Sequence, residues 1–567
     1  MTRQTEVDGV RTLLAPTDGP LHAGLAFRVG IGDEELPRRG ITHLVEHLAL
    51  YPVGVADYHY NGTTGVRYTY FHMEGSQAEV VQFLNGVCTS LRDLPTARLV
   101  AEKEVLRTEA QGRGGSVRGT LDLWRHGARG YGAAAYPELG VAALTEDDLR
   151  AWVARYFTAQ NAALWVAADE LPPGLRLELP QGERRPLPAA TSALPVRPAY
   201  FVGDEGAVAW DAVVPHSVAT GVFSEVLQRS LRRSLRHDAG LSYQVSTDRE
   251  VLGDGTDVVT AYADALPEKQ GAVLGGLVDV LASMRVGRVE QADLSAVVES
   301  SIESWEQAER VAGQLPGQAV GLLFDRPVQS TEEVSAQLRS VTTADVAAVA
   351  LAAWHDGLAM IPPGRGAEWA GLVRAPTAST TVVEGGGEHV QLDDSSSRLL
   401  VAPTGVSLVR TGAPTGTVLF DECVAVLAWP DGARRLIGPD GITVPVEPTM
   451  YAPVEGLTAF IDERTPPGVR IDRPERDPAD IPVPAPPEPG TVTTSPDRMS
   501  RTRGVVALVA LLPVLLAGVV IAAIGLIDLF VDPDRVIVLD VVAMVVGLFV
   551  LGSAVWICRH VIRRMTR

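Results

Sequence analysis

The fold is decided by the stretch VGIGDEELPRRGITHLVEHLAL, residues 29–50. If its second part is helical, His43 and His47 lie four residues apart on one face, so both imidazoles can reach one metal ion. Glu46 lies one turn on from His43, where its carboxylate can take a proton from a water molecule beside the metal. Pairs of histidines on helices are also common as ordinary surface or core residues, so the motif alone leaves both interpretations open.

A second segment with helical character, AEKEVLRTEAQ at 101–111, supplies carboxylates that could complete such a site. Glu102 and Glu109 are seven residues apart, two helical turns, and therefore share a face. One of them can bind the metal while the other supports it by a hydrogen bond to a ligand. In isolation this segment is equally typical of a charged, solvent-exposed helix face, so it gains meaning only beside the two histidines.

Together these motifs resemble the pitrilysin/insulysin family of inverted-zincin (HxxEH) metallopeptidases, which includes the mitochondrial processing peptidases. The family pattern is HxxEH followed by a helix with Glu-x6-Glu, and both parts are present. The resemblance implies Zn²⁺ held by His43, His47 and Glu109. It also implies two catalytic carboxylates, Glu46 as the general base and Glu102 as the group that supports the site.

Further segments extend the resemblance over about residues 6–363. Asn61-Gly-Thr-Thr64 is similar to the family's Asn-Ala-x-Thr edge strand, on which substrate pairs as an added strand, so Asn61 and Thr64 are expected to bind substrate. Asn-Gly is otherwise a plain turn signal. LRHDAGLSY at 235–243 resembles the segment with the family's Arg–Tyr pair. Arg236 and Tyr243 are therefore expected to hold the substrate backbone and to stabilise charge on the scissile carbonyl.

The sequence departs from the family pattern in one place. Asn61 follows His47 by 14 positions, a shorter connection than is usual in the family. Because the missing residues fall between the ligand helices, the ligands can still converge. The shape of the substrate pocket beside the metal is expected to differ.

Residues 1–363 read as two α/β halves, 1–190 and 191–363. Strand-like runs such as LHAGLAFRVGIG (21–32) alternate with helical runs such as AEVVQFLNGVCTSLRDL (78–94), and the pattern recurs in the second half. The fold expected from the resemblance is thus a tandem pair of α/β (α+β) half-domains of the pitrilysin/insulysin type. Family enzymes enclose peptides between two such pairs, so a homodimer, or a heterodimer with a related peptidase-fold subunit, is expected.

The remaining chain divides by composition. A Gly-, Pro- and Ser-rich linker is predicted at 364–397. Short alternating runs then predict a small, mainly β domain at 398–473, closed by the helical run VEGLTAFIDER, and this arrangement resembles the pleckstrin-homology-like fold. A proline-rich tether follows at 474–503. The domain shows no basic cluster typical of lipid binding, since Arg434 and Arg435 are equally consistent with a solvated turn.

Two apolar runs, 504–527 and 536–558, are each long enough to cross a membrane as a helix. Arginines precede the first run and follow the second, including the tail 559–567, so the positive-inside rule places both flanks in the cytoplasm. A buried helical hairpin is the alternative. The N-terminus has no signal-peptide pattern. These features predict a multi-pass protein of the inner (plasma) membrane with a cytoplasmic peptidase region.

Composition bears on both partners and location. The 567 residues include 69 acidic and 49 basic side chains, for a net charge of −20, which argues against nucleic acid as a partner. Three widely spaced cysteines, Cys88, Cys423 and Cys558, do not form a disulfide framework and suit a reducing compartment. The mean hydropathy of +0.12 reflects the two apolar runs within an otherwise acidic chain.

The sequence therefore predicts a membrane-anchored, cytoplasm-facing, zinc-dependent endopeptidase that hydrolyses extended peptides. The alternative from another class is a catalytically silent scaffold or partner subunit that keeps the peptidase fold to bind peptides or proteins. A third hypothesis, a lipid-sensing adaptor built on the strand-rich domain, lacks the basic pocket that it needs.

Overall fold

The computed structural model describes residues 2–53, 59–112, 114–452 and 456–485. The chain divides into two compact units, Met1–Pro484 and Ala485–Arg567. The predicted transmembrane helices at 504–527 and 536–558, the basic tail and most of the tether lie outside the described residues. Within the described ranges, no helix combines the length and apolar character needed to cross a membrane.

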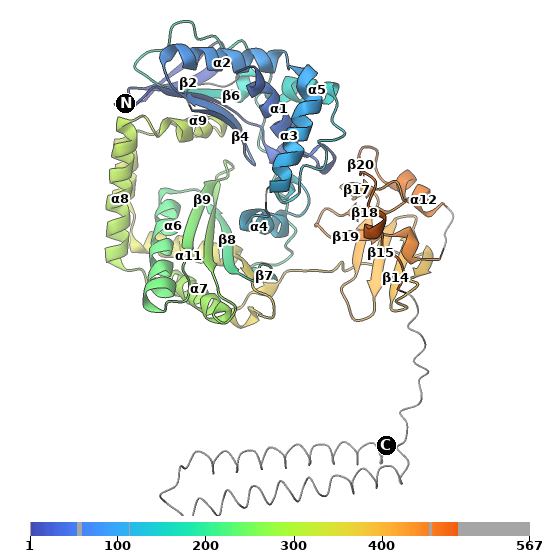
Figure 1. Cartoon of the computed structure of the whole chain (residues 1–567). Helices are drawn as coiled ribbons and strands as arrows, with labels where there is room; N and C mark the ends of the chain where they lie inside the picture. The colour runs from blue at the N-terminus through green and yellow to red at the C-terminus, as the bar shows by residue number, and fades with distance from the viewer. Residues whose placement is uncertain (1, 54–58, 113, 453–455, 486–567) are drawn as a thin grey trace, which may run out of the picture. The chain divides into compact units, whose positions relative to one another are not determined.

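The first half is a six-stranded mixed sheet with helices on one face (Figure 1). Its strands are β1 (Arg3–Val7), β2 (Val10–Ala15), β3 (His22–Phe27), β4 (Tyr60–Thr64), β5 (Thr69–Glu74) and β6 (Ala162–Ala167). They lie in the order β1-β2-β6-β3-β5-β4, which leaves β4 at one edge. Its helices are α1 (Ile41–Leu50), α2 (Gln77–Arg92), α3 (Leu99–Gly112), α4 (Val117–His126) and α5 (Glu146–Tyr156).

Local sequence explains where these helices begin. Ser76 and Glu79 form a capping box at the start of α2, and Thr145 and Asp148 do the same at α5. The apolar faces of α1, α2 and α5 bury one side of the sheet in a single core. The other side is covered by α9 (Leu315–Leu323) of the second half, as Figure 1 shows.

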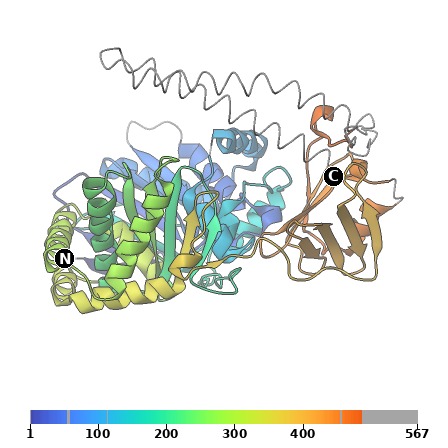
Figure 2. The same cartoon turned by 90° about the horizontal axis from the view of Figure 1, so that it is seen from below.

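The second half repeats this plan. Its strands are β7 (Ala199–Val202), β8 (Ala207–Pro215), β9 (Val245–Val251), β10 (Thr256–Asp264), β11 (Leu358–Ile361) and β12 (Val373–Arg374), in the order β12-β7-β11-β8-β10-β9. Its helices are α6 (Val218–Leu231), α7 (Gln270–Arg285), α8 (Gln291–Arg310), α9, α10 (Thr331–Ser340) and α11 (Thr343–Asp356). Figure 2 shows its green helices against the sheet. From β7 to β9 the strand order corresponds to that from β2 to β4, so β9 is the equivalent of β4.

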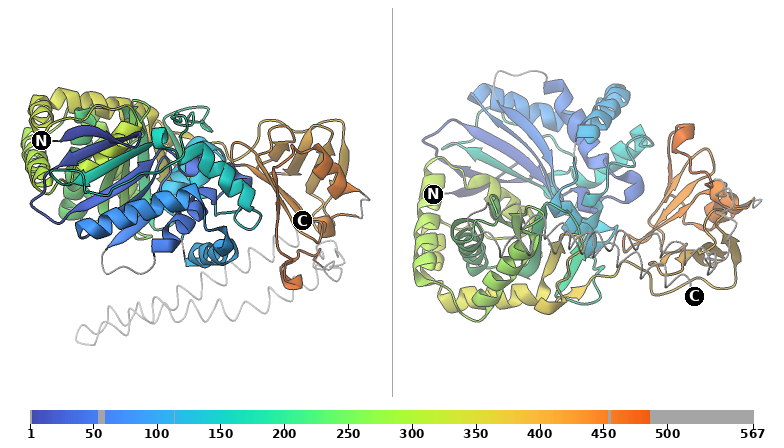
Figure 3. Two further views of the ribbon diagram at one scale, coloured as in Figure 1. Left: turned by 90° about the horizontal axis from the view of Figure 1, so that it is seen from above. Right: turned by 60° about the horizontal axis from the view of Figure 1, so that its bottom comes forward.

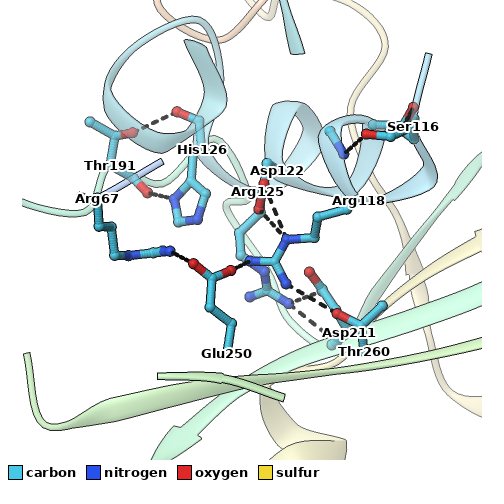
Figure 4. A network of polar contacts seen from close by, with 12 residues as sticks. Arg67, Ser116, Arg118, Asp122, Arg125, His126, Thr191, Asp211, Glu250 and Thr260 are labelled. Atoms are coloured by element: carbon cyan, nitrogen blue, oxygen red, sulfur yellow. Dashed lines mark hydrogen bonds and ion pairs between the residues drawn. The ribbon is translucent and has the colours of Figure 1, made fainter. Parts of the chain in front are cut away.

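Ion pairs join the two halves through α4 (Figure 4). Arg125 is buried and donates to Asp211 Oδ1 on β8 at 2.5 Å and to Asp356 Oδ2 at 2.7 Å. Arg118 lies 3.3 Å from Glu250 on β9, and Glu250 also pairs with Arg67 of the first half. Asp211 is fully buried, and Arg125 supplies the opposite charge beside its carboxylate. These contacts join the two halves.

The strand-rich domain has two four-stranded sheets (Figure 3). One contains β13 (Gly387–Val390), β14 (Ser397–Ala402), β15 (Gly405–Arg410) and β16 (Gly416–Leu419). The other contains β17 (Ala425–Ala428), β18 (Arg434–Ile437), β19 (Thr443–Val446) and β20 (Arg470–Asp472), in the order β19-β18-β17-β20. Helix α12 (Leu457–Arg464) packs on their shared core.

The structure confirms the mixed α/β architecture. In the range predicted as a small, mainly β domain it places the two four-stranded sheets and helix α12. Its relation to the pleckstrin-homology-like fold stays a prediction. The predicted linker at 364–397 is wrong in part, because it contains β12 and β13, which are too short for an alternating pattern to reveal. The run TVLFDECVAVLAW (417–429) is divided between β16 and β17, which belong to different sheets.

Candidate metal centre

Helix α1 carries His43, Glu46 and His47, as the sequence predicts. Its first turn is held by the buried carboxylate of Glu34, which accepts hydrogen bonds from the backbone N–H groups of Gly40 and Thr42, both at 2.9 Å. Gly40 has a φ of 102°, a left-handed conformation that favours glycine. The charge on Glu34 also suits the positive end of the helix dipole, so the start of α1 is firmly placed.

Helix α3 brings Glu109 to the two histidines. His43 Nε2 lies 3.7 Å from Glu109 Oε2, and His47 Nε2 lies 3.6 Å from Glu109 Oε1. One ligand atom from each residue lies within 4.8 Å of those of the others. Zinc with ligands at 2.0–2.1 Å in tetrahedral geometry separates neighbouring ligand atoms by about 3.3 Å. The three predicted ligands therefore fit a zinc ion in both donor type and spacing.

Each imidazole also contacts a carboxylate through its Nδ1 atom. His47 Nδ1 lies 3.4 Å from Glu102 Oε2, which places Glu102 in the supporting position that the sequence predicts. His43 Nδ1 lies 2.8 Å from Glu138 Oε1. Sequence reasoning missed Glu138, because it lies 95 positions from His43 in a loop that carries no metal-site motif. With Nδ1 engaged, each ring directs Nε2 toward Glu109.

Glu46 lies beside these ligands in a buried position. Thr64 on β4 donates its hydroxyl to Glu46 Oε2 at 2.6 Å. Burial raises the pKa of Glu46, and the hydrogen bond from Thr64, followed by the charges of the two histidines, acts in the opposite direction. A carboxylate of this kind takes up a proton more readily than an exposed glutamate, as a general base requires.

The two residues predicted to bind substrate from the first half are placed differently from each other. Asn61 and Thr64 both lie on β4, the predicted edge strand, which is indeed at the edge of the sheet. Asn61 accepts a hydrogen bond from the backbone of Gly62. Thr64 faces the helical side and contacts the proposed base.

Arg236 and Tyr243 lie in the second half and are brought together. The Arg236 guanidinium stands over the Tyr243 ring at 5.0 Å, and Tyr243 is 78% exposed. The structure therefore forms the predicted pair but presents it to solvent, while all three groups of the metal centre come from the first half.

Comparisons with solved structures show which proteins share this fold. A protease from Helicobacter pylori superposes with a TM-score of 0.54 at 17% identity, over 64% of this chain and 99% of that one. An M16 inactive domain from Pseudomonas fluorescens gives 0.53 at 14% identity, over 63% and 97%. A putative M16-like peptidase from Alicyclobacillus acidocaldarius gives 0.51 at 14% identity, over 64% and 98%.

The chain has the M16 peptidase fold. This confirms the resemblance to pitrilysin-type peptidases at the level of the fold. No protein-family model and no curated protein matches the sequence. Among these structures the M16 fold occurs both in a protease and in an inactive domain.

Proposed function

We propose that this chain is a zinc-dependent endopeptidase that hydrolyses extended peptides. The observation that carries the proposal is the convergence of His43, His47 and Glu109 on one point, with a buried Glu46 beside them. An M16 fold that had lost catalysis would be free to lose any of these groups.

Zinc would be held by His43, His47 and Glu109, and when bound it supplies a Lewis acid that polarises water and the scissile carbonyl. Glu46 takes the proton of the attacking water and passes it to the leaving amine. Thr64 fixes the direction of the Glu46 carboxylate. Glu102 and Glu138 hold the imidazoles in the orientation that the ligand set needs.

The substrate would add to the sheet as an extended strand along β4, whose outer edge is not used by another strand of the described sheet. The exposed Arg236–Tyr243 pair suits the role of contacting substrate held by a second subunit. We therefore propose that the active form is a homodimer or a heterodimer with a related peptidase-fold subunit.

The same proposal includes membrane anchoring. It rests on the length and apolar character of segments 504–527 and 536–558 and on the arginines that flank them. The peptidase region would then lie on the cytoplasmic side of a bacterial inner (plasma) membrane.

The alternative is a catalytically silent scaffold or partner subunit. Full-length protein in detergent, with Glu46→Gln and His47→Ala variants, separates the two through zinc content and cleavage of a peptide library. The proposal predicts that Glu46→Gln retains zinc without turnover and that His47→Ala loses both. Stoichiometric zinc in the wild type with no cleavage of any peptide would favour the scaffold.

A further inference from the structure

The contact between His43 and Glu138 connects the metal centre to a loop outside the two ligand helices. Both side chains are nearly buried, and the atoms that join them, Nδ1 and Oε1, are 2.8 Å apart. This contact is shorter than the 3.4 Å between His47 and Glu102. Glu138 is therefore the more closely engaged of the two carboxylates behind the ligand set.

Glu138 stands on a loop between the short helical segment Gly130–Ala135 and α5. The loop is tied to the start of α1, because Gly140 donates its backbone N–H to the carbonyl of Arg39 at 3.1 Å. The side chain of Val141 lies against Gly40 so closely that a Cβ added to Gly40 would be only 2.5 Å from Val141 Cγ2. On this side, packing against the start of α1 sets the position of the loop that carries Glu138.

The same region of the first half also packs against the strand-rich domain. A buried apolar cluster joins the two regions; from the first half it contains Leu36, Ala128, Ala133 and Leu139, and from the strand-rich domain Ala425, Leu427, Ile437 and Ile471. Leu139 directly follows Glu138. The backbone N–H of Ala128 also donates to the carbonyl of Pro439 at 2.9 Å, and Arg129 donates to the carbonyl of Glu422 at 3.0 Å.

We propose that Glu138 is a positioning residue for His43 and that the strand-rich domain controls zinc affinity by holding the loop that carries it. The inference rests on the proposed zinc site. A carboxylate on Nδ1 fixes the tautomer and the ring orientation and makes Nε2 a better ligand. The strand-rich domain thereby forms part of the support of the metal centre.

Replacement of Glu138 tests the first part. Zinc dissociation constants of full-length protein are measured by competition with a chromophoric chelator. We expect a weakening of about 10- to 100-fold for Glu138→Ala and a smaller loss for Glu138→Gln, whose amide oxygen can still accept a hydrogen bond. Glu104→Gln, at an exposed position of α3, is the control. The melting temperature of each apo-protein shows whether the effect is on the fold.

A matched pair of isoleucines tests the second part. Ile437 lies in the cluster against the first half, while Ile461 is buried in the strand-rich domain's own core. Both alanine variants remove the same atoms from the same domain. We expect Ile437→Ala to weaken zinc binding several-fold and Ile461→Ala to leave it unchanged.

The outcomes separate this inference from the proposed function. If the wild type binds no zinc, the proposed function fails. If the wild type binds zinc and both Glu138 variants bind equally well, Glu138 does not position His43. If the two isoleucine variants behave alike, the strand-rich domain does not control the site through this contact. If zinc affinity falls only in step with the melting temperature, Glu138 has a purely structural role.

Discussion

Thr64→Val is the substitution that most sharply isolates the proposed general base. Valine has nearly the shape of threonine but lacks the hydroxyl that donates to Glu46 Oε2 at 2.6 Å. The metal ligands lie on α1 and α3, whereas Thr64 lies on β4, so the zinc content is expected to stay the same. Only the direction and the proton affinity of the Glu46 carboxylate change.

The size of the effect follows from that hydrogen bond. A hydrogen bond to a charged group contributes about 1.5–3 kcal/mol, which corresponds to a loss of about 10- to 150-fold in kcat/KM if it is fully expressed in the transition state. The bond from Thr64 opposes the burial that raises the pKa of Glu46, so its loss raises this pKa further. Because the base must be deprotonated, the acid limb of the kcat/KM profile is expected to move to higher pH.

Cleavage of a fluorogenic peptide across a pH range, with zinc content measured in parallel, checks both expectations. Thr63→Val is the matched control, since successive side chains of a strand point to opposite faces and Thr63 pairs with Tyr70. Equal kcat/KM and equal pH profiles for Thr64→Val and the wild type would refute the role of Thr64. Loss of zinc from Thr64→Val would show that the substitution acts on the metal centre.

Further predictions concern buried ionisable groups, which affect the stability of the fold and the reactivity of a thiol. Arg125→Met leaves the charge of Asp211 buried without its partner, so urea unfolding should show a loss of about 3–5 kcal/mol that Asp211→Asn partly restores; no restoration would contradict the ion-pair account. Burial lowers the pKa of His126 to about 4, so between about pH 4 and 6.5 the unfolded chain binds more protons than the folded protein. The free energy of unfolding therefore falls as the pH drops through this window. His126→Asn should remove up to about 3 kcal/mol of that pH dependence. Asp122, whose pKa is raised to about 6, contributes with the opposite sign in both proteins, so the comparison of variant with wild type isolates His126. Burial raises the pKa of Cys88 to about 12, so peptide mapping after iodoacetamide treatment at pH 8 should find it unmodified in folded protein and modified in urea.

Much of the site could be predicted because its chemistry is local in sequence. The four-residue spacing of His43 and His47 and the seven-residue spacing of Glu102 and Glu109 each define a helix face, and α1 and α3 present those faces to each other. That the helices converge did not follow from spacing alone. It came from the resemblance of the motifs to a family with this arrangement.

The remaining parts depend on contacts between distant segments. Glu34 and Glu138 are ordinary acidic residues in the sequence, and only the folded chain shows that one holds the start of α1 and the other holds His43. The partner of Thr64 is a helix residue 18 positions earlier, which a strand motif cannot reveal. Strands β12 and β13 are held by pairing with longer neighbours, since their own sequences lack a periodic apolar pattern.

The metal centre is tested most directly by the zinc content and X-ray absorption spectrum of the full-length protein. The ligand set His43, His47 and Glu109 predicts one zinc ion per chain, with two imidazole nitrogens at about 2.0–2.1 Å and the remaining ligands oxygen. His43→Ala is expected to remove that zinc. No bound zinc in the wild type, or a zinc spectrum without imidazole that survives His43→Ala, would contradict the account.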